Sequence, residues 1–213
     1  GEQAVIAQLG DHFDENTHRR VVRLAKQLEL APFPGFQECV PSYTTVCIYF
    51  DLWKVMDEIR SAGAMSTPYE AVCRWVTDAM NHVADRANLA DYDGKEVRIP
   101  VCYCRECGPD LEPLALGSNL SIGEAIHLHS QSRYSVSMIG FMPGFPYMSG
   151  LPKQLAAPRL DTPRKYVPQG SVAVAGNQTG IYPVASPGGW RIIGRTPVKL
   201  FRPEETNPSL LEV

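Results

Sequence analysis

Residues 171–196 read SVAVAGNQTGIYPVASPGGWRIIGRT, three short apolar runs separated by glycine and proline. Runs of this length and β-branched content are typical of strands bounded by turns. The strands predicted in this part of the chain are 96–103, 134–141, 171–176, 180–184, 190–196 and 198–201, with one helical insert at 121–131. Many short strands with few helices between them indicate a barrel or a sandwich, so we expect a β-barrel over residues 88–213.

The N-terminal residues 1–87 have a different texture, in which strand-like and helix-like segments alternate. The predicted elements are strands at 4–10 and 44–51 and amphipathic helices at 17–30 and 61–87. Helices with one apolar face need a sheet to cover, so we predict a small α/β sandwich domain here. Segment 88–95, NLADYDGK, is polar and turn-prone and is the predicted linker. The expected fold class is therefore α+β, with domains at 1–87 and 88–213.

The composition excludes several classes of function. The 213 residues are 44% hydrophobic and 20% charged, which is typical of globular domains. A net charge of −3 provides no basic field for a phosphate backbone, so nucleic acid is not an expected partner. The sequence contains no run of about 18 apolar residues, and its first residues lack the layout of a signal peptide. We therefore expect a cytoplasmic protein without a membrane partner.

Segment 140–152, GFMPGFPYMSGLP, combines prolines and glycines with aromatic residues. Its prolines restrict the backbone, so Phe141, Phe145 and Tyr147 would be presented with little freedom. An apolar wall that is rigid before binding loses little conformational entropy when a partner binds. Such a wall suits one side of a ligand cleft or of a protein interface. The same composition also suits a structural connection between strands. We predict binding roles for Phe145 and Tyr147, and the residues leave the choice between cleft and interface open.

Segment 176–180, GNQTG, offers neutral polar groups close to flexible glycines. Amide and hydroxyl groups recognise a planar amide or lactam without the desolvation cost of a charge. We predict that Asn177 and Thr179 bind substrate. Gln178 is predicted to be catalytic, as a donor that stabilises a developing oxyanion.

Three arginines flank these segments, Arg159, Arg164 and Arg195. A guanidinium group can hold a carboxylate through two parallel hydrogen bonds. We predict substrate-binding roles for Arg159 and Arg195, although an arginine considered alone is more often a surface residue.

Two histidines, His127 and His129, lie in the predicted helical insert. Residues two apart on a helix point to different faces, so the two cannot easily line one pocket. An imidazole carries a proton near neutral pH, and we predict that His129 is catalytic. The alternative is a buried histidine that holds the 140–152 loop.

Six cysteines occur, and segment 102–108, CYCRECG, has C-x-C and C-x-x-C spacing. A structural zinc site usually takes its four ligands from two such pairs, and the chain has no second close pair. We therefore expect incidental or structural thiols and no metal site in this chain.

Residues 139–152, IGFMPGFPYMSGLP, and 157–201, which begin APRLDTPRKYV, resemble the signature of a known family. It contains the B subunit of 5-oxoprolinase, the kinase inhibitor KipI and allophanate hydrolase subunit 1. Upstream, VPSYTTVCIYFD, IPVCY, GPDLE and LHSQSRYSV follow in the family's order, so the resemblance covers nearly the whole chain. It implies an N-terminal α/β domain and a C-terminal cyclophilin-like β-barrel, as in the carboxyltransferase region of urea carboxylase. At 102–110 the chain reads CYCRECGPD, and the cysteines depart from the family's pattern.

The resemblance implies a subunit of an ATP-dependent 5-oxoprolinase, which opens 5-oxo-L-proline to L-glutamate. Its partners would be a companion carboxyltransferase-like barrel subunit and a further oxoprolinase subunit. The chain has no GxxxxGK[ST] or GxGxxG motif, so ATP would belong to the assembled complex and the chain alone would be inactive. The alternatives are a KipI-like inhibitor of a sensor histidine kinase and a carboxyltransferase-type subunit of urea carboxylase or allophanate hydrolase. Amide and hydroxyl groups beside an aromatic wall favour the enzyme subunit.

Overall fold

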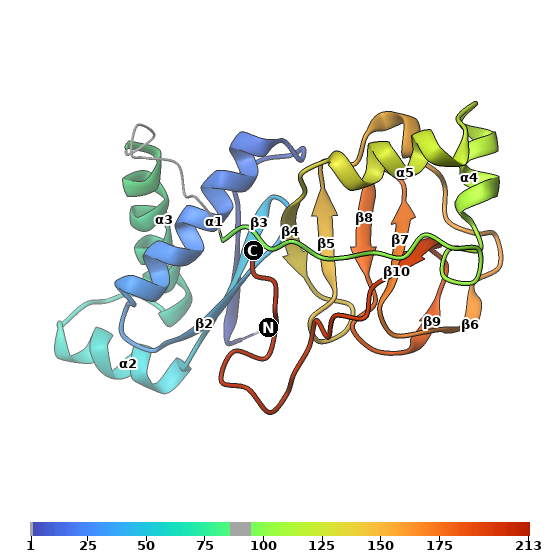
Figure 1. Ribbon diagram of the computed structural model, residues 1–213. Helices are drawn as coiled ribbons and strands as arrows, with labels where there is room; N and C mark the ends of the chain where they lie inside the picture. Colours follow the sequence, from blue (N-terminus) through green and yellow to red (C-terminus); the bar gives the residue numbers. More distant parts are fainter. Residues whose placement is uncertain (1, 86–94) are drawn as a thin grey trace. The chain divides into compact units, whose positions relative to one another are not determined.

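The computed structural model describes residues 2–85 and 95–213 of the chain (Figure 1). These residues divide into two compact units, Gly1–Gly94 and Lys95–Val213. The linker predicted at 88–95 lies, except for its last residue, outside the described residues. Both units combine helices with sheet, so the predicted mixture of the two is confirmed. In the described ranges, no helix has both the length and the apolar character needed to cross a membrane.

The first unit is a three-stranded antiparallel sheet packed against helices. The sheet has the order β1 (Ala4–Gln8), β3 (Thr45–Phe50), β2 (Phe36–Pro41), and the helices are α1 (Glu15–Leu30), α2 (Leu52–Ser61) and α3 (Pro68–Asp85). Val21, Leu24 and Leu28 recur at helical spacing and are buried in the same core as Val46 and Ile48 of β3. Strand β2 was not predicted because polar residues interrupt its apolar pattern, and helix α2 was not predicted because it is short.

The second unit is built on a five-stranded antiparallel sheet in the order β10-β7-β8-β5-β4 (Figure 1). Its strands are β4 (Ser135–Ile139), β5 (Pro146–Ser149), β7 (Ser171–Ala175), β8 (Gln178–Ile181) and β10 (Arg191–Arg195). A separate pair is formed by β6 (Arg164–Val167) and β9 (Ser186–Gly188), and the helical segments are α4 (Leu111–Gly117), α5 (Ile122–Gln131) and the 3-10 turn η1 (Lys153–Leu155). The insert predicted at 121–131 is thus α5, which begins with a capping box between Ser121 and Glu124.

The closed barrel predicted for this unit is not found among residues 95–213. The sheet ends at β10 on one side and β4 on the other, and the segments predicted as strands at 96–103 and 198–201 contribute single bridges, Cys102 to Arg195 and Phe201 to Ser209. Pro100 lies within the first segment and Pro197 directly precedes the second, and a proline cannot donate to a strand ladder. The sheet therefore stays open in the described residues.

The two faces of the five-stranded sheet carry different side chains. Residues of α4 and α5 pack on one face with Val172, Val174 and Ile181. The other face carries Ala173 and Ala175 of β7, which are buried with aromatic residues and with Val167 of β6. Side chains alternate along a strand, so consecutive residues within β7, or within β8, lie on opposite faces of the sheet. This alternation decides which of the predicted site residues can meet.

Candidate functional site

An aromatic cluster covers the sheet face opposite the helices. Its members are Phe141, Phe145, Tyr147, Tyr182 and Trp190. The ring centre of Phe145 lies 4.9 Å from that of Tyr147, 5.2 Å from that of Tyr182 and 5.5 Å from that of Trp190, all in edge-to-face geometry. Phe145 is only 1% exposed, so it supports the cluster from within. Tyr147 is half-buried and forms part of the accessible edge.

Polar groups lie at that edge. The guanidinium carbon of Arg159 is 6.0 Å from the ring centre of Trp190, within the range of a cation–π interaction. Tyr147 contacts the same ring, at 5.7 Å between the centres of Tyr147 and Trp190. Burial raises the pKa of Tyr147, and the positive charge of Arg159 opposes this shift. Tyr147 is therefore a neutral phenol at neutral pH, able to donate and to accept a hydrogen bond.

Gln178 belongs to the same face as the aromatic cluster. A Cβ built on Gly180 would lie 3.0 Å from Phe145 and 3.1 Å from Trp190, so position 180 faces the cluster. Gln178 is two residues earlier in β8 and half-buried, and alternation puts it on that side too. Asn177 lies in the exposed turn before the strand.

Phe141 occupies a strained position in the β4–β5 connection. Its φ is 66°, in the left-handed region that bulky residues rarely adopt, and its side chain is 64% exposed. Phe141 also contacts the ring of Phe145, at 5.6 Å between centres. Strain that holds an apolar ring toward solvent is more typical of a functional loop than of a plain connection.

His129 lies on the helix-covered side of the sheet and both of its ring nitrogens are bonded inside the protein. Nδ1 is 2.8 Å from the hydroxyl of Tyr103, and Nε2 is 3.1 Å from Oγ1 of Thr179. Thr179 donates its own proton to the carbonyl of Ala173 at 3.0 Å, so it accepts from Nε2–H. Nδ1 consequently accepts from Tyr103, whose pKa is raised to about 12 by burial and which stays protonated. Burial also lowers the pKa of His129 to about 4, so the ring is neutral at pH 7.

The predicted site residues therefore form two groups rather than one. Met148 pairs with Thr179 and Tyr147 pairs with Gly180, so Thr179 and Tyr147 point to opposite faces of the sheet. Thr179 is fully buried and bonded to His129 on the helix side. The prediction that residues two apart in α5 face different ways is confirmed, since His127 is exposed and His129 is buried. The catalytic role of His129 stays a prediction. The hydrogen-bond partners described for His129 are Tyr103, Thr179 and Tyr134, and none of these three lies in the 140–152 loop.

A partly buried ion pair, not predicted from the sequence, joins the start of α4 to two strands. Asp110 accepts a hydrogen bond from Nη2 of Arg164 at 2.7 Å and one from the backbone N–H of Ile192 at 2.6 Å. Within residues 95–213, Nη1 of Arg164 is buried without a hydrogen-bond partner. Arg164 is thus occupied on β6 and binds Asp110 rather than a free carboxylate.

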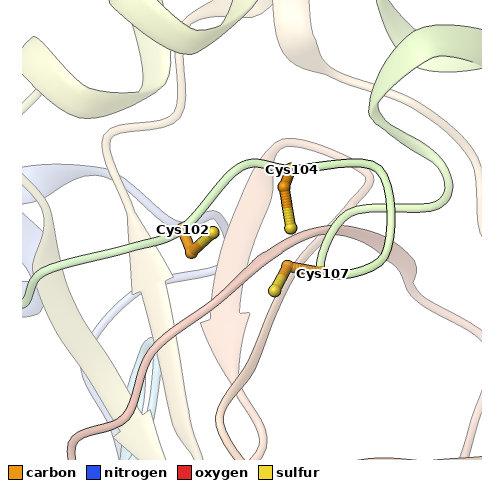
Figure 2. Close-up of side chains that lie close together, drawn as sticks. All are labelled: Cys102, Cys104 and Cys107. Carbon is orange, nitrogen blue, oxygen red and sulfur yellow. The ribbon is translucent and has the colours of Figure 1, made fainter.

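Three cysteines converge beside β10 (Figure 2). The sulfur atoms of Cys102, Cys104 and Cys107 all lie within 4.8 Å of one another. Cys102 pairs through its backbone with Arg195, whose Nε is buried and lacks a partner among the described residues. Arg195, predicted to bind substrate, therefore has its backbone paired with that of Cys102 at the start of the cysteine loop.

Hydrogen bonds inside this loop make the three thiols unequal. The pKa of Cys102 is lowered, first by a hydrogen bond from the backbone N–H of Cys104. The pKa of Cys104 is raised to about 12, first by its hydrogen bond with the thiol of Cys107. A signal for this arrangement was present in the sequence, since C-x-C spacing in an extended segment puts both sulfurs on one side.

Comparison with known proteins agrees with this architecture. The family model described as carboxyltransferase domain, subdomain C and D, matches residues 1–211. The chain is 42% identical to the 5-oxoprolinase B subunit of Bacillus subtilis (strain 168), over 99% of this chain and 86% of the relative. It is 34% identical to the 5-oxoprolinase B subunit of Escherichia coli O157:H7, over 99% of this chain and 88% of the relative.

A solved structure shows the same fold. The crystal structure of TTHA0988 superposes with a TM-score of 0.79 at 32% sequence identity, covering 99% of this chain and 38% of that chain. The chain thus spans well under half the length of that structural relative, while it spans most of the sequence relatives. Match over almost every residue, in sequence and in fold, shows that the chain belongs to the family of carboxyltransferase domains, subdomains C and D.

Proposed function

We propose that this chain is a subunit of an ATP-dependent 5-oxoprolinase, which opens 5-oxo-L-proline to L-glutamate. The observation that carries the proposal is 42% identity, over nearly the whole chain, to a protein named as the B subunit of 5-oxoprolinase. A second relative of the same name is 34% identical over the same span.

The accessible edge of the aromatic cluster has the chemistry that this substrate needs. 5-Oxoproline has an apolar ring, a lactam group and a carboxylate. Arg159 offers a positive charge for the carboxylate, and Tyr147 offers a half-buried ring and a neutral hydroxyl. The side chain of Gln178 donates to the lactam oxygen as negative charge develops there.

His129 takes a positioning role in this proposal. Its Nε2–H holds Thr179, which is the residue after Gln178 in β8. Because Thr179 faces the helices and Gln178 the aromatic cluster, fixing one fixes the orientation of the other. In this proposal His129 therefore acts on Gln178 through the strand, as a positioning residue rather than as the proton carrier that the sequence predicts.

ATP binding is assigned to the assembled complex. The chain carries neither a GxxxxGK[ST] nor a GxGxxG loop, the two familiar cradles for nucleotide phosphates. The proposed partners are a companion carboxyltransferase-like subunit and a further oxoprolinase subunit. No step on the nucleotide is assigned to residues of this chain.

The purified chain alone is expected to show no turnover of 5-oxoproline with ATP, because it lacks a nucleotide site of a known kind. Tagged chain recovered from its native host should bring down the companion subunits, and that complex should hydrolyse ATP only when 5-oxoproline is added. Steady-state ATPase assays of chain and complex measure this. Recovery of a sensor histidine kinase, with no ATPase stimulated by 5-oxoproline, would overturn the proposal.

In the assembled complex, Gln178→Ala should lower kcat by roughly 10²-fold or more, the usual effect of losing an oxyanion donor. Arg159→Ala should instead raise KM, since it removes a contact made equally in ground and transition states. The matched control is Arg98→Ala, an arginine with a 93% exposed side chain outside the cluster. Unchanged kinetics in both variants, with the complex intact by size-exclusion chromatography, would remove the aromatic edge from the proposal.

A further inference from the structure

The cysteine loop, residues 102–108, brings three sulfur ligands together without a disulfide. All six cysteines are free, and the three in this loop have Sγ atoms within 4.8 Å of one another. Three thiolates bound to one zinc ion have Zn–S distances of about 2.3 Å, which in tetrahedral geometry separates the sulfurs by about 3.8 Å. The change needed is at most about 1 Å, within reach of side-chain rotation.

The convergence follows from how the loop is anchored. Tyr103 points inward to its hydrogen bond with His129, so its neighbours Cys102 and Cys104 point outward to the same side. The backbone of Cys102 is bonded to Arg195 of β10 in both directions, at 2.8 and 2.9 Å. The first half of the loop is thus fixed by the sheet edge and by the core.

The second half is a tight turn that returns Cys107 to the other two. The carbonyl of Cys104 accepts from the backbone N–H of Cys107 at 3.0 Å and from that of Gly108 at 2.8 Å. A side chain at Gly108 would collide with the carbonyl of Ile193, so only glycine lets the turn lie against β10. A loop held at both ends keeps its ligands in place before binding, which is what a metal site requires.

We propose that Cys102, Cys104 and Cys107 bind one Zn²⁺ ion through three thiolates, with solvent in the fourth position. Three Zn–S bonds form and the three thiol protons pass to the buffer. Thiolates favour zinc or copper(I) over harder cations, and a tetrahedral site with three protein ligands suits zinc. The fourth position faces solvent, because Cys102 and Cys104 are exposed.

Charge and neighbouring groups fit this ion. Three thiolates and Zn²⁺ sum to −1, and Arg195 enters from the strand position directly opposite Cys102, with its Nε free among the described residues. The proposal replaces the expectation of no metal site. That expectation rested on the lack of a second cysteine pair, whereas the three cysteines of C-x-C and C-x-x-C bring their sulfur atoms to one place.

The full chain, purified without a histidine tag and fully reduced, should bind one Zn²⁺ per chain in competition with a chromophoric chelator. X-ray absorption should find three sulfur neighbours at about 2.3 Å. Cys102→Ser, Cys104→Ser and Cys107→Ser should each weaken binding by roughly 10²-fold or more, since each removes one of three ligands. Cys73→Ser is the matched control, because Cys73 lies in α3, outside the loop, and should leave affinity unchanged.

A second measurement on the unmodified chain keeps the proposal falsifiable where a serine variant does not fold. Zinc should protect Cys102, Cys104 and Cys107 from alkylation, while Cys39, Cys47 and Cys73 react equally with and without the metal, as read by mass spectrometry. Less than one-tenth equivalent of zinc on the reduced chain would overturn the proposal. Equal alkylation of all six thiols with zinc present, or binding that survives the loop substitutions, would do the same.

Discussion

Replacing Phe145 with alanine is expected to lower the free energy of unfolding of residues 95–213 by about 3–5 kcal/mol. Phe145 is 1% exposed and its ring contacts Phe141, Tyr147, Tyr182 and Trp190. Truncation removes the apolar area and leaves a cavity that four rigid rings cannot easily close. Urea unfolding of the full chain, with hydrogen exchange of β7 and β8 amides to isolate this unit, measures the loss.

The matched control is Phe141→Ala in the same loop. Its ring is 64% exposed, so the change should stay within about 1 kcal/mol. A loss of less than about 1 kcal/mol for Phe145→Ala would show that the aromatic cluster is not the core of this face. Any loss of function in Phe145→Ala therefore acts through folding, whereas a loss in Phe141→Ala reports a contact made by the exposed ring.

The local sequence pattern predicted the strands and helices that are specified by their own residues. Strand β7 is five small or β-branched residues between glycines, all buried, and α5 begins with Ser121 and Glu124 at capping-box spacing. Both lie where the sequence predicts them. The segment 96–103 has the apolar content of a strand but forms one bridge, because pairing depends on a partner edge that the segment's own residues do not specify.

The candidate site was harder to predict for a geometric reason. Phe145 and Tyr147 were identified by their stiff loop, and Gln178 by its neutral amide group in a segment bounded by glycines. Thr179 was grouped with Gln178, although consecutive residues of a strand face opposite sides. Tyr182, directly after β8, and Trp190, directly before β10, complete the aromatic cluster, and only the order of β8, β7 and β10 in the sheet brings them there.

A series of contacts leads from the cysteine loop to Gln178 at the accessible edge of the aromatic cluster. Tyr103 follows Cys102 in the loop and bonds His129, which bonds Thr179 beside Gln178. The two side-chain links, Tyr103 to His129 and His129 to Thr179, are hydrogen bonds of 2.8 and 3.1 Å between buried or half-buried groups. Order in the cysteine loop thus supports order in β8, and the neutral imidazole of His129 is the link on which both depend.

Protonation of His129 should therefore cost stability, by about 3 kcal/mol between pH 6.5 and pH 4. Burial lowers the pKa of the folded state from 6.5 to about 4, so below pH 6.5 the unfolded chain takes up a proton that the folded chain refuses, at about 1.4 kcal/mol per pH unit. This stability is complete above pH 6.5 and is lost as the pH falls to 4. Urea unfolding of wild type and His129→Gln across this range isolates the effect, because glutamine offers a donor and an acceptor but does not titrate, and other groups cancel in the difference. NMR titration of the imidazole in the wild type gives the pKa directly, and a midpoint near 6.5, or equal pH slopes in the two proteins, would contradict the buried neutral ring.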